Sequence, residues 1–111
     1  MGSMKEKSPA ENTRFILETL METLTPTNRL CRVDAQAAII VAKTAKICTS
    51  GQVIHIPGPI KIFYLPKNRV ATFDFHSVAE LDNHWIVDIA QLPGNRVYDG
   101  LKDYRKKAIL V

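Results

Sequence analysis

The spacing of hydrophobic and polar residues changes near the middle of the chain. Before Gly51, apolar residues recur every three or four positions, which is typical of helices that pack one face on a core. After Gly51, they form short runs separated by proline, glycine and asparagine, which is typical of strands and turns. The pattern predicts an α+β domain in which two N-terminal helices pack on a four- to five-stranded antiparallel sheet.

The first helix is predicted to begin at Ser8, which can cap it, with Pro9 at the first helical position and Glu11 closing a capping box. One apolar stripe then faces the core, formed by Phe15, Leu17, Leu20, Met21 and Leu24. Thr25-Pro26 should end the helix, because the residue before a proline avoids the helical region.

The second helix is predicted over residues 28–48. Most of its positions are alanine, valine or isoleucine, so we expect it to be buried on several sides. Ser50-Gly51 provides the stop signal, with the glycine as a left-handed cap.

The second half of the chain is predicted to form a meander of short strands. The expected strands cover residues 52–56, 60–65, 70–78, 84–90 and 96–98, and the turns between them carry proline, glycine or asparagine. The tail, residues 101–111, fits either a charged helical turn or a last edge strand.

The chain has 111 residues, of which 46% are hydrophobic, enough for one core and too few for two. We expect one domain over residues 4–111, because Met1-Gly2-Ser3 precede a second methionine and resemble a cloning remnant. No apolar run approaches the roughly 18 residues needed to cross a bilayer, so we expect no membrane span. Two cysteines do not make a disulfide scaffold, which favours the cytoplasm, or delivery into a target cell if the domain is an effector.

The net charge of +4 permits contact with nucleic acid but does not demand it. We interpret the basic residues first as a solvated face. A nucleic-acid-binding sheet would need exposed aromatic rings, and most candidates alternate with polar residues and should point inward: Phe63, Tyr64, Phe73, Phe75, Trp85, Tyr98 and Tyr104.

Cys31 is the candidate nucleophile, because it lies near the start of the second predicted helix. Backbone amides and aligned peptide dipoles at a helix N-terminus stabilise a thiolate, and Arg29 and Arg32 would add positive potential. Cys48 lies at the opposite end of that helix, where the dipole disfavours a thiolate, and is interpreted as a small core residue. If the helix begins several residues earlier, Cys31 is a buried thiol as well.

A general base must reach this thiol, and the pairing rules leave two histidine–aspartate pairs open. His84 and Asp99 would lie opposite each other if the strands 84–90 and 96–98 pair. His76 and Asp88 would do so if the chain turns tightly at residues 81–83. In either case the carboxylate would orient the imidazole ring toward Cys31.

The order of these parts resembles the minimal papain-like core. An amphipathic helix, Cys31 at the head of a second helix, several strands, then Asn83-His84-Trp85-Ile86-Val87 and Arg96-Val97-Tyr98-Asp99-Gly100 are similar to papain-fold toxin and glutamine-deamidase domains of bacterial effectors. Bacteriocin-processing peptidases and, more distantly, transglutaminase-like proteins share this layout.

The resemblance implies a thiol-dependent hydrolase or acyl transferase that acts on an amide, by deamidation of a protein glutamine or by peptide cleavage. It ranks His84 and Asp99 ahead of His76 and Asp88 as the partners of Cys31. Papain-like peptidases usually carry a glutamine several residues before the cysteine to stabilise the oxyanion. This chain lacks it, and Asn28 or the backbone amide of Cys31 is expected to serve.

Other classes of function receive less support from the residues. No Cys-x-x-Cys, His-x-His or His-Glu-x-x-His motif predicts a metal, and the five glycines form no phosphate-binding loop, so no cofactor is expected. A non-enzymatic module that binds a protein partner, such as an inhibitor, immunity or accessory protein, is the main alternative. A basic nucleic-acid-binding domain is the lesser one.

Overall fold

The computed structural model describes residues 8–27 and 31–110. Two helices come first, followed by a four-stranded antiparallel meander in the order β1-β2-β3-β4 and a short C-terminal helix. The elements are α1 (Pro9–Met21), α2 (Cys31–Thr44), β1 (Gly51–Tyr64), the 3-10 turn η1 (Leu65–Lys67), β2 (Arg69–Leu81), β3 (Trp85–Val87), β4 (Val97–Tyr98) and α3 (Leu101–Lys107). The predicted α+β class, with two N-terminal helices before an antiparallel sheet, is confirmed.

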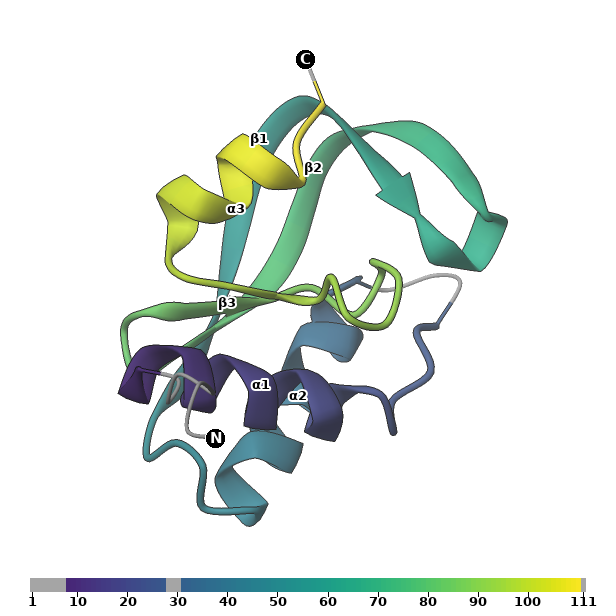
Figure 1. Ribbon diagram of the computed structural model, residues 1–111. Helices are drawn as coiled ribbons and strands as arrows, with labels where there is room; N and C mark the ends of the chain where they lie inside the picture. The colour runs from purple at the N-terminus through teal and green to yellow at the C-terminus, as the bar shows by residue number, and fades with distance from the viewer. Residues whose placement is uncertain (1–7, 28–30, 111) are drawn as a thin grey trace, which may run out of the picture.

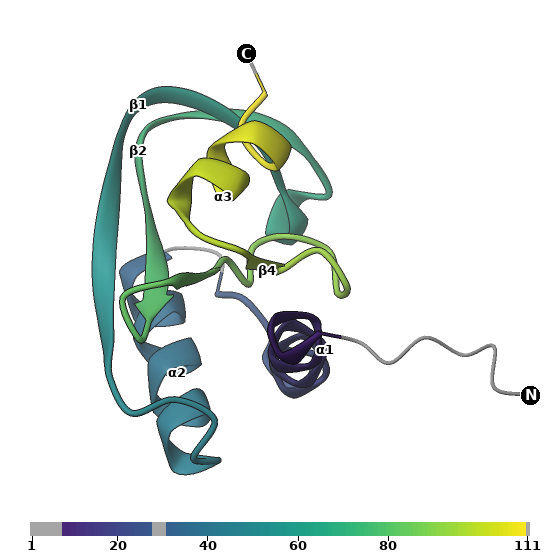
Figure 2. The same cartoon turned by 60° about the vertical axis from the view of Figure 1, so that its left-hand side comes forward.

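The sheet carries helices on both faces (Figures 1 and 2). Against one face, α1 and α2 form a core with the sheet residues Ala79, Leu81, Val87 and Val97. Against the other, α3 packs on a second cluster that includes Ile56, Ile62, Val78, Ile86 and Tyr98. Because neighbouring residues of β2 and β3 alternate between these clusters, the sheet is buried on both sides where it meets the helices.

The start of α1 follows the predicted cap. The Ser8 side chain accepts a hydrogen bond from the Glu11 backbone N–H at 3.1 Å, and Pro9 occupies the first turn. Regular α-helix stops at Met21, four residues before Thr25, although Leu24 still packs on the core. The helix therefore ends before the Thr25-Pro26 pair that was expected to stop it.

Helix α2 is shorter and more exposed than the sequence indicated. Its described part, Cys31–Thr44, ends four residues before the predicted end at 48, and Lys46 with φ of 60° turns the chain before Gly51, which is already part of β1. Ile40 is 63% exposed and Val33 is 44% exposed, so the prediction of a helix buried on several sides is wrong. The apolar composition of α2 suggested more burial than the helix has, because only one side of α2 packs against the sheet and α1.

One long strand, β1, replaces the two strands predicted at 52–56 and 60–65. The register with β2 shifts between Pro57 and Ile60, so Pro57-Gly58-Pro59 form a bulge within the strand and not a turn. A Cβ atom on Gly58 would lie 2.4 Å from the carbonyl oxygens of Phe73 and Asp74, which explains why glycine occupies this position.

Strand β3 is much shorter than the predicted 84–90, and this shortness shapes the site. It pairs with β2 only at Ala79–Leu81, so the stretch of β2 before Ala79 has no partner strand on that side among the described residues. The chain after Val87 leaves the sheet at Asp88 and returns as β4. The tail, left open between helix and strand, forms α3 and then a single bridge from Leu110 to Lys61.

A buried arginine fixes the loop between β3 and β4 against α1. The Arg96 guanidinium donates hydrogen bonds to the carbonyl oxygens of Gln91, Met21 and Leu24 at 2.9, 2.6 and 2.9 Å. The carboxylate of Glu18 accepts the backbone N–H groups of Arg96 and Val97. These bonds tie residues 88–97 to the first helix.

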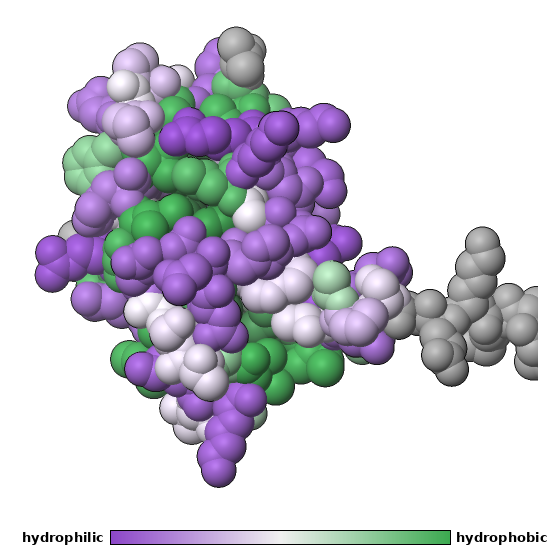
Figure 3. Space-filling view, turned by 90° about the vertical axis from the view of Figure 1, so that its left-hand side faces the viewer, coloured by the Kyte–Doolittle hydropathy of each residue, from purple (hydrophilic) through white to green (hydrophobic). Residues whose placement is uncertain are grey.

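None of the helices within residues 8–27 and 31–110 is long and apolar enough to cross a membrane. Apolar and hydrophilic side chains alternate over the face shown in Figure 3. The large apolar side chains at the surface include Ile16, Val33, Ile40, Val70 and Phe75.

Candidate functional site

Cys31 is the first described residue of α2, and the three residues before it lie outside the described ranges. Its side chain is partly exposed and lines a small cavity together with His76 and Ser77 of β2, the two residues that lower its pKa. The contact arises because α2 packs on β2 and because β3 ends before reaching this part of β2. The thiol therefore approaches the strand at an open edge.

His76 links the thiol to a carboxylate. It is only 1% exposed, and its Nε2 lies 3.0 Å from Oδ2 of Asp88. With Nε2 engaged by Asp88, Nδ1 is the ring nitrogen left for Cys31. Cys31, His76 and Asp88 thus form a continuous chain of thiol, imidazole and carboxylate.

Asp88 is held by more than the histidine. The Tyr104 hydroxyl of α3 donates to Oδ2 at 2.7 Å, the Ala90 backbone N–H donates to Oδ1 at 3.1 Å, and the Gln91 amide lies 3.4 Å from Oδ2. Four donors around a carboxylate that is 4% exposed keep it ionised and fixed in orientation.

The electrostatics of the chain favour an ion pair. The hydrogen bond with His76, followed by those from Ser77, lowers the pKa of Cys31 to about 7 against the opposing effect of burial. Burial alone would lower the pKa of His76. The charge of Asp88 and hydrogen bonds with Asp88 and Cys31 outweigh it and raise that pKa to about 10. These opposite shifts favour a thiolate on Cys31 and an imidazolium on His76 near neutral pH.

A small cavity lies between the three side chains. Its volume is about 10 Å³, close to the minimum for one water molecule. Asp34 and Ser77 line it together with Cys31, His76 and Asp88. Asp34 is itself held by the Thr27 backbone N–H, which donates to both carboxylate oxygens at 3.0 and 3.1 Å.

The first-ranked pair, His84 and Asp99, is not brought to Cys31. The two side chains do bond to each other, because His84 precedes β3 and Asp99 follows β4 in the paired strands. Both are about half exposed, and His84 lies beyond the β2–β3 turn. The separation along β2 from His76 to Leu81 is roughly 17 Å at 3.3 Å per residue. The structure therefore places the alternative pair, His76 and Asp88, and not His84 and Asp99, around the cavity that Cys31 lines.

The proposed oxyanion residue Asn28 lies outside the described residues. Two participants were missed by the sequence reasoning, namely Ser77 and Tyr104. Strand alternation places Ser77 on the face of Ala79 and Leu81, which packs against α2, and His76 on the opposite face with Val78. The contact of His76 with Cys31 therefore depends on the open edge of β2. Tyr104 offered one signal, since it is the aromatic residue in the mostly charged segment that forms α3.

Cys48 differs from Cys31 in every respect that matters for reactivity. It is buried in the core cluster beneath the helices, as the sequence indicated. Burial, followed by the charge of Asp82, raises its pKa above the ordinary value. The pKa values of the two thiols are therefore shifted in opposite directions within one chain.

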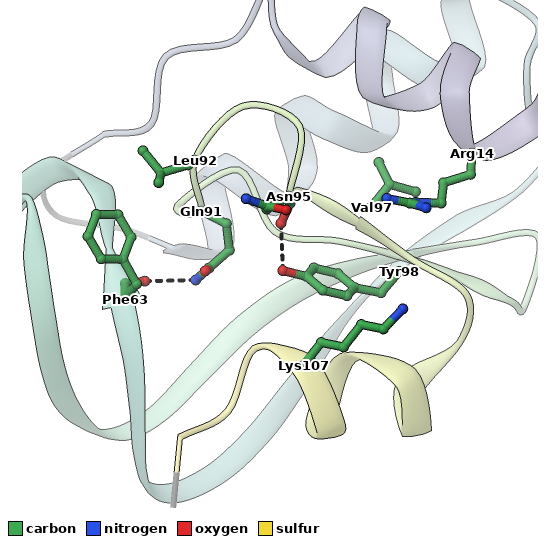
Figure 4. Close-up of a pocket in the computed structure, with 8 residues that line it drawn as sticks. All are labelled: Arg14, Phe63, Gln91, Leu92, Asn95, Val97, Tyr98 and Lys107. Atoms are coloured by element: carbon green, nitrogen blue, oxygen red, sulfur yellow. Dashed lines mark hydrogen bonds between the residues drawn. The ribbon is translucent and has the colours of Figure 1, made fainter. Parts of the chain in front are cut away.

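Gln91 also lines a separate cavity of about 340 Å³ (Figure 4). Its side-chain amide donates to the Phe63 carbonyl at 2.7 Å, while the Tyr98 hydroxyl donates to the Asn95 carbonyl across the same cavity. Arg14 and Lys107 supply positive charge from α1 and α3. These bonds brace the loop that presents Asp88.

Within the described ranges, no group of three or more histidine, cysteine, aspartate or glutamate side chains is arranged to hold a metal ion. Of the aromatic residues considered for stacking on bases, Tyr64, Tyr98 and Tyr104 are buried and Phe75 is 58% exposed. Comparisons with protein-family models, curated proteins and solved structures found no significant match. The papain-like resemblance therefore stays a prediction.

Proposed function

We propose that the protein is a thiol-dependent hydrolase or acyl transferase that acts on an amide, with Cys31 as nucleophile. His76 is the general base and acid, and Asp88 orients the ring of His76. The observation that carries this proposal is that the partly exposed Cys31 shares a small cavity with the buried, hydrogen-bonded pair His76 and Asp88.

In the proposed reaction, the Cys31 thiolate attacks the carbonyl carbon of the amide and forms a carbon–sulfur bond. The His76 imidazolium then donates its proton to the nitrogen of the leaving group, and the carbon–nitrogen bond breaks to give a thioester. In hydrolysis, water loses a proton to His76 as it attacks the thioester. The carboxylic acid leaves, and the thiolate–imidazolium pair is restored.

The substrate proposed for this chemistry is the side-chain carboxamide of a protein glutamine or a peptide bond. Partial exposure of Cys31 supports a large substrate, since the reacting group can approach from outside. The cavity behind the thiol is too small for more than about one water. A bacterial toxin or effector setting rests on the resemblance in the order of elements.

A module that binds a protein partner without chemistry is the second candidate. The observation in its favour is the exposure of large apolar side chains on α2 and β2, where Ile40 and Phe75 are 63% and 58% exposed. In that case the Cys31 thiol would need no special reactivity, so one experiment separates the two candidates.

The test is alkylation by iodoacetamide near neutral pH, with each cysteine followed by mass spectrometry. Cys31 should react at least tenfold faster than Cys48. His76→Gln should remove most of this advantage, because it removes the imidazolium. His84→Gln is the matched control, since it alters an aspartate-paired histidine away from Cys31, and it should leave the rate unchanged. Equal slow rates at both thiols would overturn the enzymatic proposal.

A further inference from the structure

A second side-chain network meets Cys31 on the face of β2 that packs against α2, opposite the face that carries His76. Ser77 is 3% exposed and lines the small cavity with Cys31. Its Oγ lies 2.6 Å from Nδ1 of His55, a residue of β1. Cys31 is thus flanked by two histidine-containing networks: His76 with Asp88 on one side, and Ser77 with His55 on the other.

The positions of Ser77 and His55 are fixed by the sheet. The two residues are direct cross-strand partners in the β1–β2 register, so their side chains project from the same face. The His55 ring also meets the edge of Phe75 at 6.3 Å between centroids and 77° between planes. The short contact with Ser77 therefore follows from backbone pairing and ring packing.

We propose that the Ser77 hydroxyl is a second hydrogen-bond donor to the Cys31 thiolate and that His55 is its positioning residue. This inference rests on the proposed function and adds two residues to the same site. A serine hydroxyl has a single hydrogen. When His55 Nδ1–H donates to Ser77 Oγ, that hydrogen is free to point at the Cys31 sulfur.

The Ser77 hydroxyl would stabilise the Cys31 thiolate in a way that His76 alone does not. The titratable groups around Cys31 are His76 on β2, Asp88 after β3, Asp34 on α2, Tyr64 on β1 and Tyr104 on α3. The two carboxylates disfavour a thiolate. His76 carries the only positive charge among these side chains. A neutral donor on the other side stabilises the thiolate without competing for the proton that His76 must transfer.

The test is the pH dependence of Cys31 alkylation by iodoacetamide in single variants. Ser77→Ala should raise the pH midpoint by about one unit, a tenfold change in the ionisation constant. His55→Phe keeps a ring against Phe75 but lacks Nδ1, and it should shift the midpoint in the same direction. His55→Phe should add nothing in the Ser77→Ala background, because it acts through the hydroxyl.

Two further variants serve as controls for the substitutions at Ser77 and His55. Ser77→Thr retains the hydroxyl and suits a strand, so it should keep the wild-type midpoint. His84→Phe, on the exposed pair away from Cys31, should also leave it unchanged. A wild-type midpoint in Ser77→Ala and His55→Phe would overturn this inference alone. A wild-type protein whose Cys31 titrates like an ordinary thiol would instead overturn the proposed function.

Discussion

His76 Nε2 and Asp88 Oδ2 lie 3.0 Å apart although 12 positions separate the two residues, and both side chains are almost fully buried. The pair is built by the β2–β3 hairpin, whose second strand stops at Val87 and releases Asp88 toward the unpaired part of β2. A buried histidine beside a buried carboxylate is charged, and that charge is available to the partly exposed Cys31.

Asp88→Asn tests the charge of this carboxylate. We expect the pKa of His76 to fall and that of Cys31 to rise, because the amide keeps the shape but not the charge that holds the imidazolium. Alkylation of Cys31 near pH 7 should slow by about tenfold, and the free energy of unfolding should fall by about 3 kcal/mol. Asp99→Asn, at the exposed pair, should change stability by less than about 0.5 kcal/mol and leave the alkylation rate alone.

The pH dependence of stability should reveal both halves of the pair. The raised pKa of His76 gives stability that is fully present below about 6.5 and lost as the pH rises through about 10. The lowered pKa of Cys31 gives stability that is present above about 9 and lost as the pH falls through about 7. Between pH 7 and 9 these slopes oppose each other, so the pair should contribute a nearly constant free energy.

Cys31→Ser should expose the histidine slope by removing the opposing one. We expect the free energy of unfolding of this variant, relative to wild type, to fall between pH 7 and 9 by up to about 1.4 kcal/mol per pH unit. Urea denaturation at several pH values measures it. If the free energy of unfolding depends on pH in the same way in both proteins, the folded protein does not lower the pKa of Cys31, and the prediction is contradicted.

Tyr104→Phe removes one donor to Asp88 and should affect stability and reactivity together. The lost hydrogen bond to a charged group should cost about 2 kcal/mol, and alkylation of Cys31 should slow because Asp88 is less well held. Tyr98→Phe is the matched control, since its buried hydroxyl donates to the Asn95 carbonyl and not to Asp88. It should lower the melting temperature while the alkylation rate stays at the wild-type value.

Arg96→Met tests the attachment of the β3–β4 loop to α1. Three carbonyl oxygens would lose a charged donor in a buried place, so we expect a loss of about 3 kcal/mol or more. Arg105→Met, on the exposed side of α3, should be close to neutral. A neutral Arg96→Met would show that the loop is held by other contacts.

Sequence signals predicted the structure correctly where the outcome depends on a few neighbouring residues, as at a helix cap or a hairpin. Ser8 and Pro9 predicted the start of α1, and Cys48 was expected in the core, where it lies. The bond between His84 and Asp99 was also predicted from strand order. Each of these depends on neighbours in sequence or on one hairpin.

The ranking of the histidine pairs depended on strand lengths, which the sequence pattern does not encode. His84-Trp85-Ile86-Val87 reads as the start of a strand that could extend to Ala90, whereas pairing stops at Val87. That early stop frees Asp88 to turn toward His76 and opens the edge of β2 to Cys31. Likewise, the apolar composition of α2 could not show that Ile40 faces outward, because burial is set by what packs on the helix.

The most direct test of the central claim is a thiolate titration by ultraviolet absorbance, taking the difference between the wild-type protein and Cys31→Ser. We predict that the Cys31 thiolate appears with a midpoint near pH 7, well below that of Cys48. His76→Gln should move this midpoint upward. A midpoint near pH 9 that is indifferent to His76 would contradict it.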